Sequence, residues 1–124
     1  MTICNLVHET PMHILFLCNA NVHRSRSAED FFRAESNSYI FKSAGLSEKY
    51  CTKYGSTLCT LELFEWADKV FVMEPQHKKR IADYAGERYL HKVEALDIED
   101  IYKYMQPELL ELFQSDTKLK CLLP

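Results

Sequence analysis

The chain has 124 residues, enough for one domain with a single hydrophobic core and too few for two. Apolar residues make up 47% of the chain, a globular balance, and a formal net charge of −3 is unlike that of a nucleic-acid binder. No apolar run approaches the roughly 20 residues of a membrane span, and the first residues do not resemble a secretory signal. We therefore expect a cytoplasmic protein with no membrane or nucleic-acid partner, in which any anion site is local.

The cysteines indicate no metal site. There are five, an odd number, and no two have the C-x-x-C spacing of zinc ligands. We infer reduced thiols, most of them small buried side chains as at Cys59, and we expect neither a metal nor a cofactor.

Strand-like and helix-like segments alternate along the chain. Residues 1–11 form an N-terminal arm without periodicity, and a single domain of residues 12–124 follows. Strands are predicted at 14–17, 39–44, 69–73 and 92–96, helices starting near Ser25, at Ser56 or Thr57, at Gln76 and at Pro107, and loops at 46–54 and 97–104. The basic run 77–80 predicts a solvated helix face. This order predicts an α/β fold, a four-stranded parallel sheet with helices on both faces.

The stretch from Cys18 to Ser25 predicts a phosphate-binding loop after the first strand. Cys18 leaves the end of an apolar strand, and Arg24 and Ser25 stand where a helix begins. The N–H groups of such a loop converge on one point, and the helix N-terminus adds positive charge. The loop would hold a tetrahedral oxyanion and stabilise a thiolate at Cys18, which we interpret as a nucleophile that attacks a bound phosphate.

Hydrolysis needs further groups around this loop. Arg24 offers a planar fork to two phosphate oxygens, Ser25 can donate to the sulfur, and a carboxylic acid must protonate the leaving group. The carboxyl ends of parallel strands share one edge, where Cys18, Glu74 and Asp100 each follow a predicted strand. The spacing alone leaves open that Arg24 is a surface residue and that the loop only binds phosphate.

These residues resemble the low-molecular-weight protein tyrosine phosphatase family. The similarity covers most of residues 13–114 and rests on 14–18 with Asn21, Arg24 and Ser25, on 43–45, on 67–74, and on the acid loop 98–102, which is isoleucine–glutamate–aspartate–proline–tyrosine in the family.

The resemblance implies a role for each matched residue. The implied roles are Cys18 as nucleophile, Arg24 as phosphate clamp, Ser25 as helper of the sulfur, Asp100 as general acid with Asp97 as the competing choice, Tyr102 as an aromatic wall beside a substrate ring, and Asn19, Ala20, Asn21, Val22 and His23 as the substrate-binding loop. Asn21 would also hold the shape of this loop.

The chain departs from the family pattern at several of these positions. The differences are Ala20 for a glycine, His23 for a second cysteine, Arg26 for a proline, Glu74 for an aspartate and Ile101 for a proline. The segment from Gly45 to Asp68 is also shorter than in typical members, so part of the substrate-recognition surface is missing.

The sequence predicts a phosphomonoester hydrolase that acts on protein tyrosine phosphate or an aryl phosphate through a phosphocysteine intermediate. Its partner would be a phosphorylated protein or a small phosphomonoester. One alternative is a thiol-dependent arsenate reductase on the same scaffold, with Cys51 and Cys59 as shuttle thiols. Another is a non-catalytic phosphate-binding or phosphocarrier module, which has no need of an acid such as Asp100.

Overall fold

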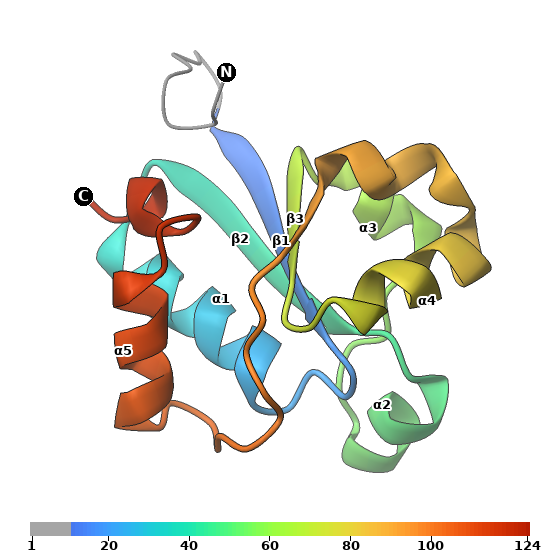
Figure 1. Ribbon diagram of the computed structural model, residues 1–124, viewed down its shortest axis with the longest axis horizontal. Coiled ribbons are helices and arrows are strands. Elements are labelled where there is room, and N and C mark those ends of the chain that lie inside the picture. Colours follow the sequence, from blue (N-terminus) through green and yellow to red (C-terminus); the bar gives the residue numbers. More distant parts are fainter. Residues whose placement is uncertain (1–10) are drawn as a thin grey trace.

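The computed structural model describes residues 11–124, which form one four-stranded parallel sheet (Figure 1). Residues 1–10 of the expected N-terminal arm lie outside the described residues. The strand order is β2 (Tyr39–Gly45), β1 (Met12–Cys18), β3 (Lys69–Val72) and β4 (Val93–Ala95), and every neighbouring pair is parallel. The predicted fold class is therefore confirmed.

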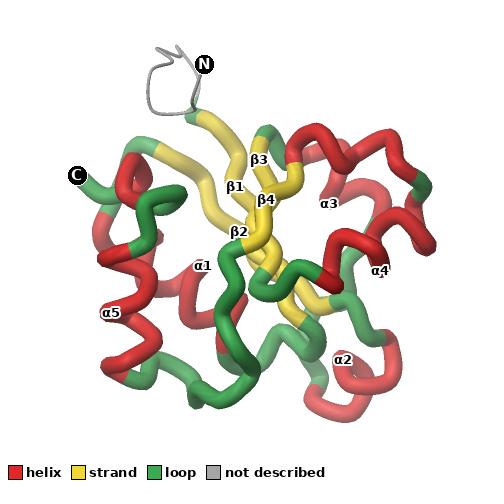
Figure 2. The backbone as a smooth tube through the Cα atoms, in the orientation of Figure 1, coloured by secondary structure: helices red, strands yellow, loops and turns green. Residues whose placement is uncertain are grey.

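Helices cover both faces of the sheet, as Figures 1 and 2 show. On one face lie α1 (Arg24–Glu35) and α5 (Pro107–Ser115), and on the other lie α3 (Leu61–Trp66) and α4 (Gln76–Ala85). The remaining helix, α2 (Glu48–Tyr54), covers neither face and lies beyond the carboxyl ends of the strands. Two short 3₁₀ segments complete the elements, Glu87–Lys92 and Lys120–Leu122. No helix of residues 11–124 is long and apolar enough to cross a membrane.

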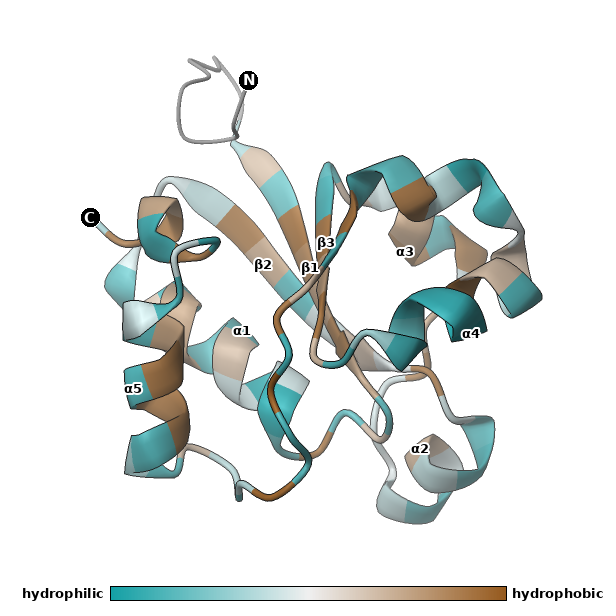
Figure 3. Cartoon of the chain, viewed as in Figure 1, coloured by the Kyte–Doolittle hydropathy of each residue, from teal (hydrophilic) through white to brown (hydrophobic). Residues whose placement is uncertain are grey.

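The central strand β1 builds a core on each side of the sheet because its side chains alternate between the two faces. Phe16 points toward α1 and α5, where its ring stacks on Phe32 at 5.6 Å and Phe71 at 5.8 Å between centroids. Leu15 and Leu17 point the other way, toward α3 and α4. Burial on both faces explains why residues 14–18 of this strand are one continuous apolar run. In Figure 3 the strand becomes brown after a paler start.

The predicted loop at 46–54 is wrong, because seven of its residues form helix α2. Ser47 Oγ caps this helix by accepting the Tyr50 N–H at 3.2 Å, and Gly55 ends it with a φ of 65°. Only Cys51 in this helix is buried, so there is no apolar stripe for periodicity to detect. The next helix also starts later than predicted, with Thr60 as its N-cap.

Two expectations about single residues also need correction. In the basic run 77–80, His77 is buried and Arg80 is half-buried, so only the two lysines are solvated. Cys18, Cys51 and Cys59 are free thiols, as expected, whereas Cys121 is disulfide-bonded.

Gly45 sits where three chain segments converge at the end of β2. A Cβ added there would lie 2.4 Å from Cys51 Sγ, 2.8 Å from the Asn19 carbonyl oxygen and 3.0 Å from the Ala20 carbonyl carbon. Two of these atoms belong to the backbone of the loop after β1, so the contact cannot be relieved by a side-chain rotation alone.

We expect Gly45→Ala to lower the free energy of unfolding by about 1–3 kcal/mol, as overpacking does. Urea denaturation measures this loss, and Cys51→Ala in the same chain should restore only part of it. Gly55→Ala is the control, because open space surrounds Gly55 and only its φ of 65° is strained, at about 1–2 kcal/mol. Full recovery in the double variant would contradict the proposed backbone clash.

Candidate active site

Cys18 lies at the carboxyl end of β1, at the base of a cavity of about 360 Å³. The cavity lies at the carboxyl ends of the strands, next to the boundary between β1 and β3. At this boundary the strand order changes direction, and parallel α/β sheets bind their ligands at such a point. The cavity is lined by Cys18, Asn19, Ala20, Val22, His23, Arg24, Tyr50, Tyr54 and Asp100.

The loop after Cys18 turns its carbonyl groups away from this cavity and into hydrogen bonds with the segment after β2. The Cys18 oxygen accepts from Leu46 N at 2.9 Å, the Asn19 oxygen accepts from Ser47 N at 2.9 Å, and the Ala20 oxygen accepts from the hydroxyl of Ser56. A trans peptide places its N–H opposite its carbonyl, so the N–H groups that follow point the other way. The loop has the geometry of an anion nest.

Asn21 holds the loop in shape through its amide group. Its φ is 55°, in the left-handed region that asparagine tolerates, and its Nδ2 donates to Ser25 Oγ at 2.8 Å and to Ser43 Oγ at 2.9 Å. Ser25 Oγ lies 3.0 Å from Cys18 Sγ. Because Asn21 supplies a donor to Ser25, the Ser25 hydroxyl proton is left to donate to the sulfur or, at a longer 3.4 Å, to the Ala44 carbonyl.

Arg24, the first residue of α1, is buried, with its side chain 2% exposed. Its Nη1 donates to Glu74 Oε1 at 2.5 Å and to the Ile98 carbonyl at 2.7 Å, and its Nε lies 3.6 Å from Asp100 Oδ1. Within residues 11–124 no protein acceptor binds Nη2, so its two N–H donors remain for a ligand. Arg24 is therefore a buried residue of the cavity wall and not the exposed surface residue that the spacing alone left open.

The charge of Arg24 also sets the electrostatics of Glu74. Burial alone would raise the pKa of Glu74, but hydrogen bonds from Arg24 and Gln76 and the Arg24 charge outweigh it and lower this pKa. Glu74 is therefore an ionised partner that orients the guanidinium. Its position after β3 is the one that the sequence indicated.

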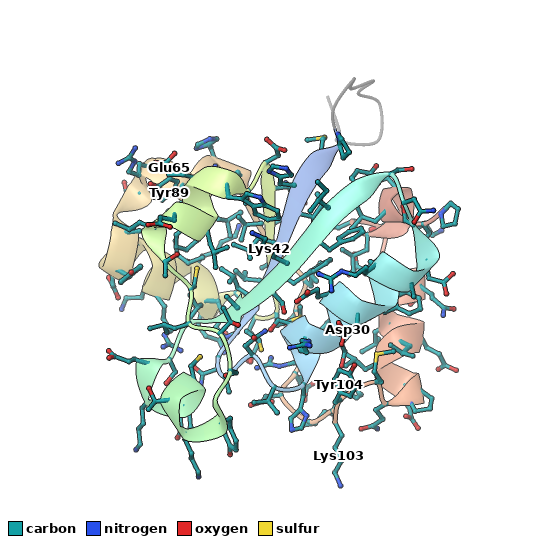
Figure 4. All side chains as sticks on the ribbon, turned by 180° about the vertical axis from the view of Figure 1, so that it is seen from behind. Asp30, Lys42, Glu65, Tyr89, Lys103 and Tyr104 are labelled. Carbon is teal, nitrogen blue, oxygen red and sulfur yellow. The ribbon has the colours of Figure 1, made fainter. Side chains whose placement is uncertain are left out.

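The structure separates the acidic residues of the loop after β4. Asp100 lines the cavity, whereas Asp97 is exposed outside it with a φ of 60°. The loop is held against α1, because the Tyr104 N–H donates to His23 Nδ1 at 3.0 Å and the Tyr104 hydroxyl donates to Asp30 at 2.5 Å (Figure 4). These contacts order the loop although Ile101 stands where the family has proline.

The cavity has an aromatic wall, but Tyr102, the residue that the resemblance implied, does not form it. Tyr102 is not among the lining residues and packs partly buried against the α1–α5 core. Tyr50 and Tyr54, from α2, line the cavity instead. Their i, i+4 spacing places them on one helix face, a signal that only an assignment of α2 as a helix would have used.

His77 lies behind Arg24 in the first turn of α4. Its Nδ1 accepts the Glu74 N–H at 3.2 Å, which places the ring proton on Nε2. Burial, reinforced by the charge of Arg24, lowers the pKa of His77 to about 4. The ring is therefore neutral at pH 7 and adds no positive charge beside the guanidinium.

Solved structures of one phosphatase family share this fold. A low-molecular-weight protein tyrosine phosphatase from Bacillus subtilis is 31% identical over 68% of this chain and 70% of its own, with a TM-score of 0.57. Vibrio vulnificus Wzb, solved with benzylphosphonate, has a TM-score of 0.67 and is 19% identical, and the match covers 91% of this chain and 95% of Wzb. The YwlE arginine phosphatase from Geobacillus stearothermophilus has a TM-score of 0.57 and is 21% identical, and the match covers 90% of this chain and 84% of YwlE.

The parallel sheet and the loop between β1 and α1 define a phosphate-binding α/β protein. The chain belongs to the low-molecular-weight protein tyrosine phosphatase family, whose members are cysteine-dependent phosphatases. By sequence, no family model and no curated protein matches it.

The low pKa of His77 makes stability depend on pH in a defined window. The unfolded chain binds a proton at His77 below about pH 6.5, but the folded protein does not until about pH 4. The free energy of unfolding should therefore fall as pH drops through this window. Denaturant titrations of wild type and His77→Asn, which keeps an acceptor near Nδ1, test this. If the free energy of unfolding of His77→Asn depends on pH as strongly as that of wild type, His77 is not the group responsible.

Proposed function

We propose that the protein hydrolyses phosphomonoesters through a phosphocysteine at Cys18. The observation that carries the proposal is that Cys18 and Arg24, from the loop between β1 and α1, and Asp100, from the loop after β4, line one cavity at the carboxyl edge of the sheet. A nucleophile, an anion clamp and an acid that line one cavity are the groups that this reaction needs.

In the first step, the Cys18 thiolate attacks phosphorus while the bond to the leaving oxygen breaks. The loop N–H groups and Arg24 hold the remaining phosphate oxygens as charge spreads over them. Asp100, as the carboxylic acid, protonates the leaving oxygen. In the second step, the Asp100 carboxylate takes a proton from water, which attacks phosphorus, and Ser25 donates a hydrogen bond to the departing sulfur.

An aryl phosphate, and phosphotyrosine in a protein, fits the walls best. Tyr50 and Tyr54 present aromatic rings and Val22 an apolar side chain, a surface suited to a phenyl ring. That Wzb was solved with benzylphosphonate supports the same class of ligand. The arginine phosphatase among the neighbours makes phosphoarginine the second substrate to test.

The chemistry of the cysteines disfavours arsenate reduction. A shuttle thiol must ionise, but burial, with Cys51 close by, raises the pKa of Cys59 to about 12. Cys51 is also buried, with its thiol against the carbonyl groups of Ala20 and Thr57. A pure phosphate carrier is disfavoured because Asp100 stands beside the clamp.

Hydrolysis of p-nitrophenyl phosphate tests the mechanism. We expect no turnover from Cys18→Ser and a loss of roughly two to four decades in kcat from Asp100→Asn, the usual contribution of general acid catalysis. Asp97→Asn is the matched control and should retain the wild-type rate. Turnover by Cys18→Ser, or a damaging effect of Asp97→Asn with none of Asp100→Asn, would overturn the respective assignment. Reduction of arsenate that is lost in Cys51→Ser or Cys59→Ser would favour the reductase.

The aromatic walls predict a preference among substrates. Tyr50→Ala and Tyr54→Ala should each lower kcat/KM several-fold for phosphotyrosine, because lost ring contacts are worth about 0.5–1.5 kcal/mol. Neither should change kcat/KM for a small alkyl phosphate, which serves as the internal control. Steady-state kinetics on the two substrates, with phosphoarginine alongside, measures this. Equal losses on aryl and alkyl phosphates would show that the tyrosines do not contact the ring.

A further inference from the structure

A second cavity of about 360 Å³ lies beside the proposed active site. Leu46, Leu58 and Tyr84 give it an apolar surface, and Leu58 and Tyr84 are 37% and 60% exposed. Its lining residues come from α2, from α4 and from the segment after β2. Figure 1 shows these elements near the carboxyl edge of the sheet. Nothing in the hydrolytic mechanism uses it.

Hydrogen bonds connect residues that line the second cavity to residues that line the first. The Leu46 N–H donates to the Cys18 and Asn19 carbonyl groups at 2.9 and 3.0 Å, so a lining residue of the second cavity is bonded to the phosphate loop. Arg80, which also lines the second cavity, binds Asn19 Oδ1 and donates to the Leu46 carbonyl at 3.0 Å. The second cavity therefore lies next to Asn19 of the phosphate loop.

The two cavities differ in charge. Glu48 and Asp83 are exposed carboxylates at the second cavity, and no side chain of residues 11–124 forms an ion pair with either. With Arg80 the net charge of the lining is −1, from two carboxylates and one guanidinium. On the other side of α2, Lys49 and Lys53 lie over the rings of the tyrosines that line the phosphate pocket. An apolar cavity with unpaired carboxylates complements a cation on an apolar stem.

We propose that this cavity is a specificity subsite that takes a lysine or arginine side chain near the phosphorylated residue of a protein substrate. This inference rests on the proposed function and extends it to a class of substrate, basic phosphopeptides. The alkyl stem of the residue contacts Leu58 and Tyr84, and its cationic end lies between Glu48 and Asp83. The phosphoryl group is held at the same time in the Cys18 loop.

Binding of phosphotyrosine peptides to Cys18→Ser tests the subsite without turnover. A lysine is moved through the positions that flank the phosphotyrosine, and each peptide is compared with one that carries norleucine, which keeps the stem and lacks the charge. At one position we expect the lysine peptide to bind about three- to tenfold more tightly, the effect of one or two exposed ion pairs. Glu48→Gln/Asp83→Asn should remove this preference. Higher salt should weaken it.

The matched control is Glu35→Gln/Glu111→Gln, which removes two exposed carboxylates from α1 and α5 on the opposite face of the sheet. It should keep the lysine preference. The subsite is overturned if lysine and norleucine peptides bind alike at every position, if the preference survives in Glu48→Gln/Asp83→Asn, or if no peptide binds. Failure of the proposed function is seen separately, as wild type that does not hydrolyse p-nitrophenyl phosphate.

Discussion

The buried charge of Arg24 is the constraint on which the site depends. A guanidinium with 2% exposure is costly to remove from water unless acceptors surround it. The structure supplies them from two other segments, Glu74 after β3 and the Ile98 carbonyl after β4, with Asp100 at 3.6 Å. This one charge therefore ties the start of α1 to the segments that follow β3 and β4. The same contacts hold the loop that carries Asp100 beside Arg24.

A second constraint fixes the shape of the Cys18 loop. Its carbonyl groups are bound by the segment that follows β2, and Gly45 is the residue that lets this segment approach so closely. This segment contains α2, so the same packing that turns the loop N–H groups toward the cavity also brings Tyr50 and Tyr54 to its mouth. This segment supplies an aromatic wall and one rim of the second cavity.

The fold class and the position of the loop from Cys18 to Arg24 were predictable, because the sequence patterns that indicate them are local. A continuous apolar run followed by Cys18, and Arg24 at a helix start, placed the loop at the end of a strand without any knowledge of distant contacts. Alternation of strands and helices then brought Glu74 and Asp100 to the same edge. The position of Tyr102 was not predictable in this way. Its side chain packs against the α1–α5 core, and burial against a distant helix leaves no mark in a loop sequence.

The sequence by itself determined the four strands, the parallel α/β class and the loop from Cys18 to Ser25, because periodicity and residue chemistry act over short stretches. Only the tertiary structure decided that 46–54 is a helix, that Asp100 and not Asp97 reaches the cavity, and that Arg80 joins the phosphate loop to a second cavity. Those outcomes depend on contacts between residues far apart in the chain. The free energy of these packing and ion-pair contacts decides the outcome, and no short stretch of sequence contains that information.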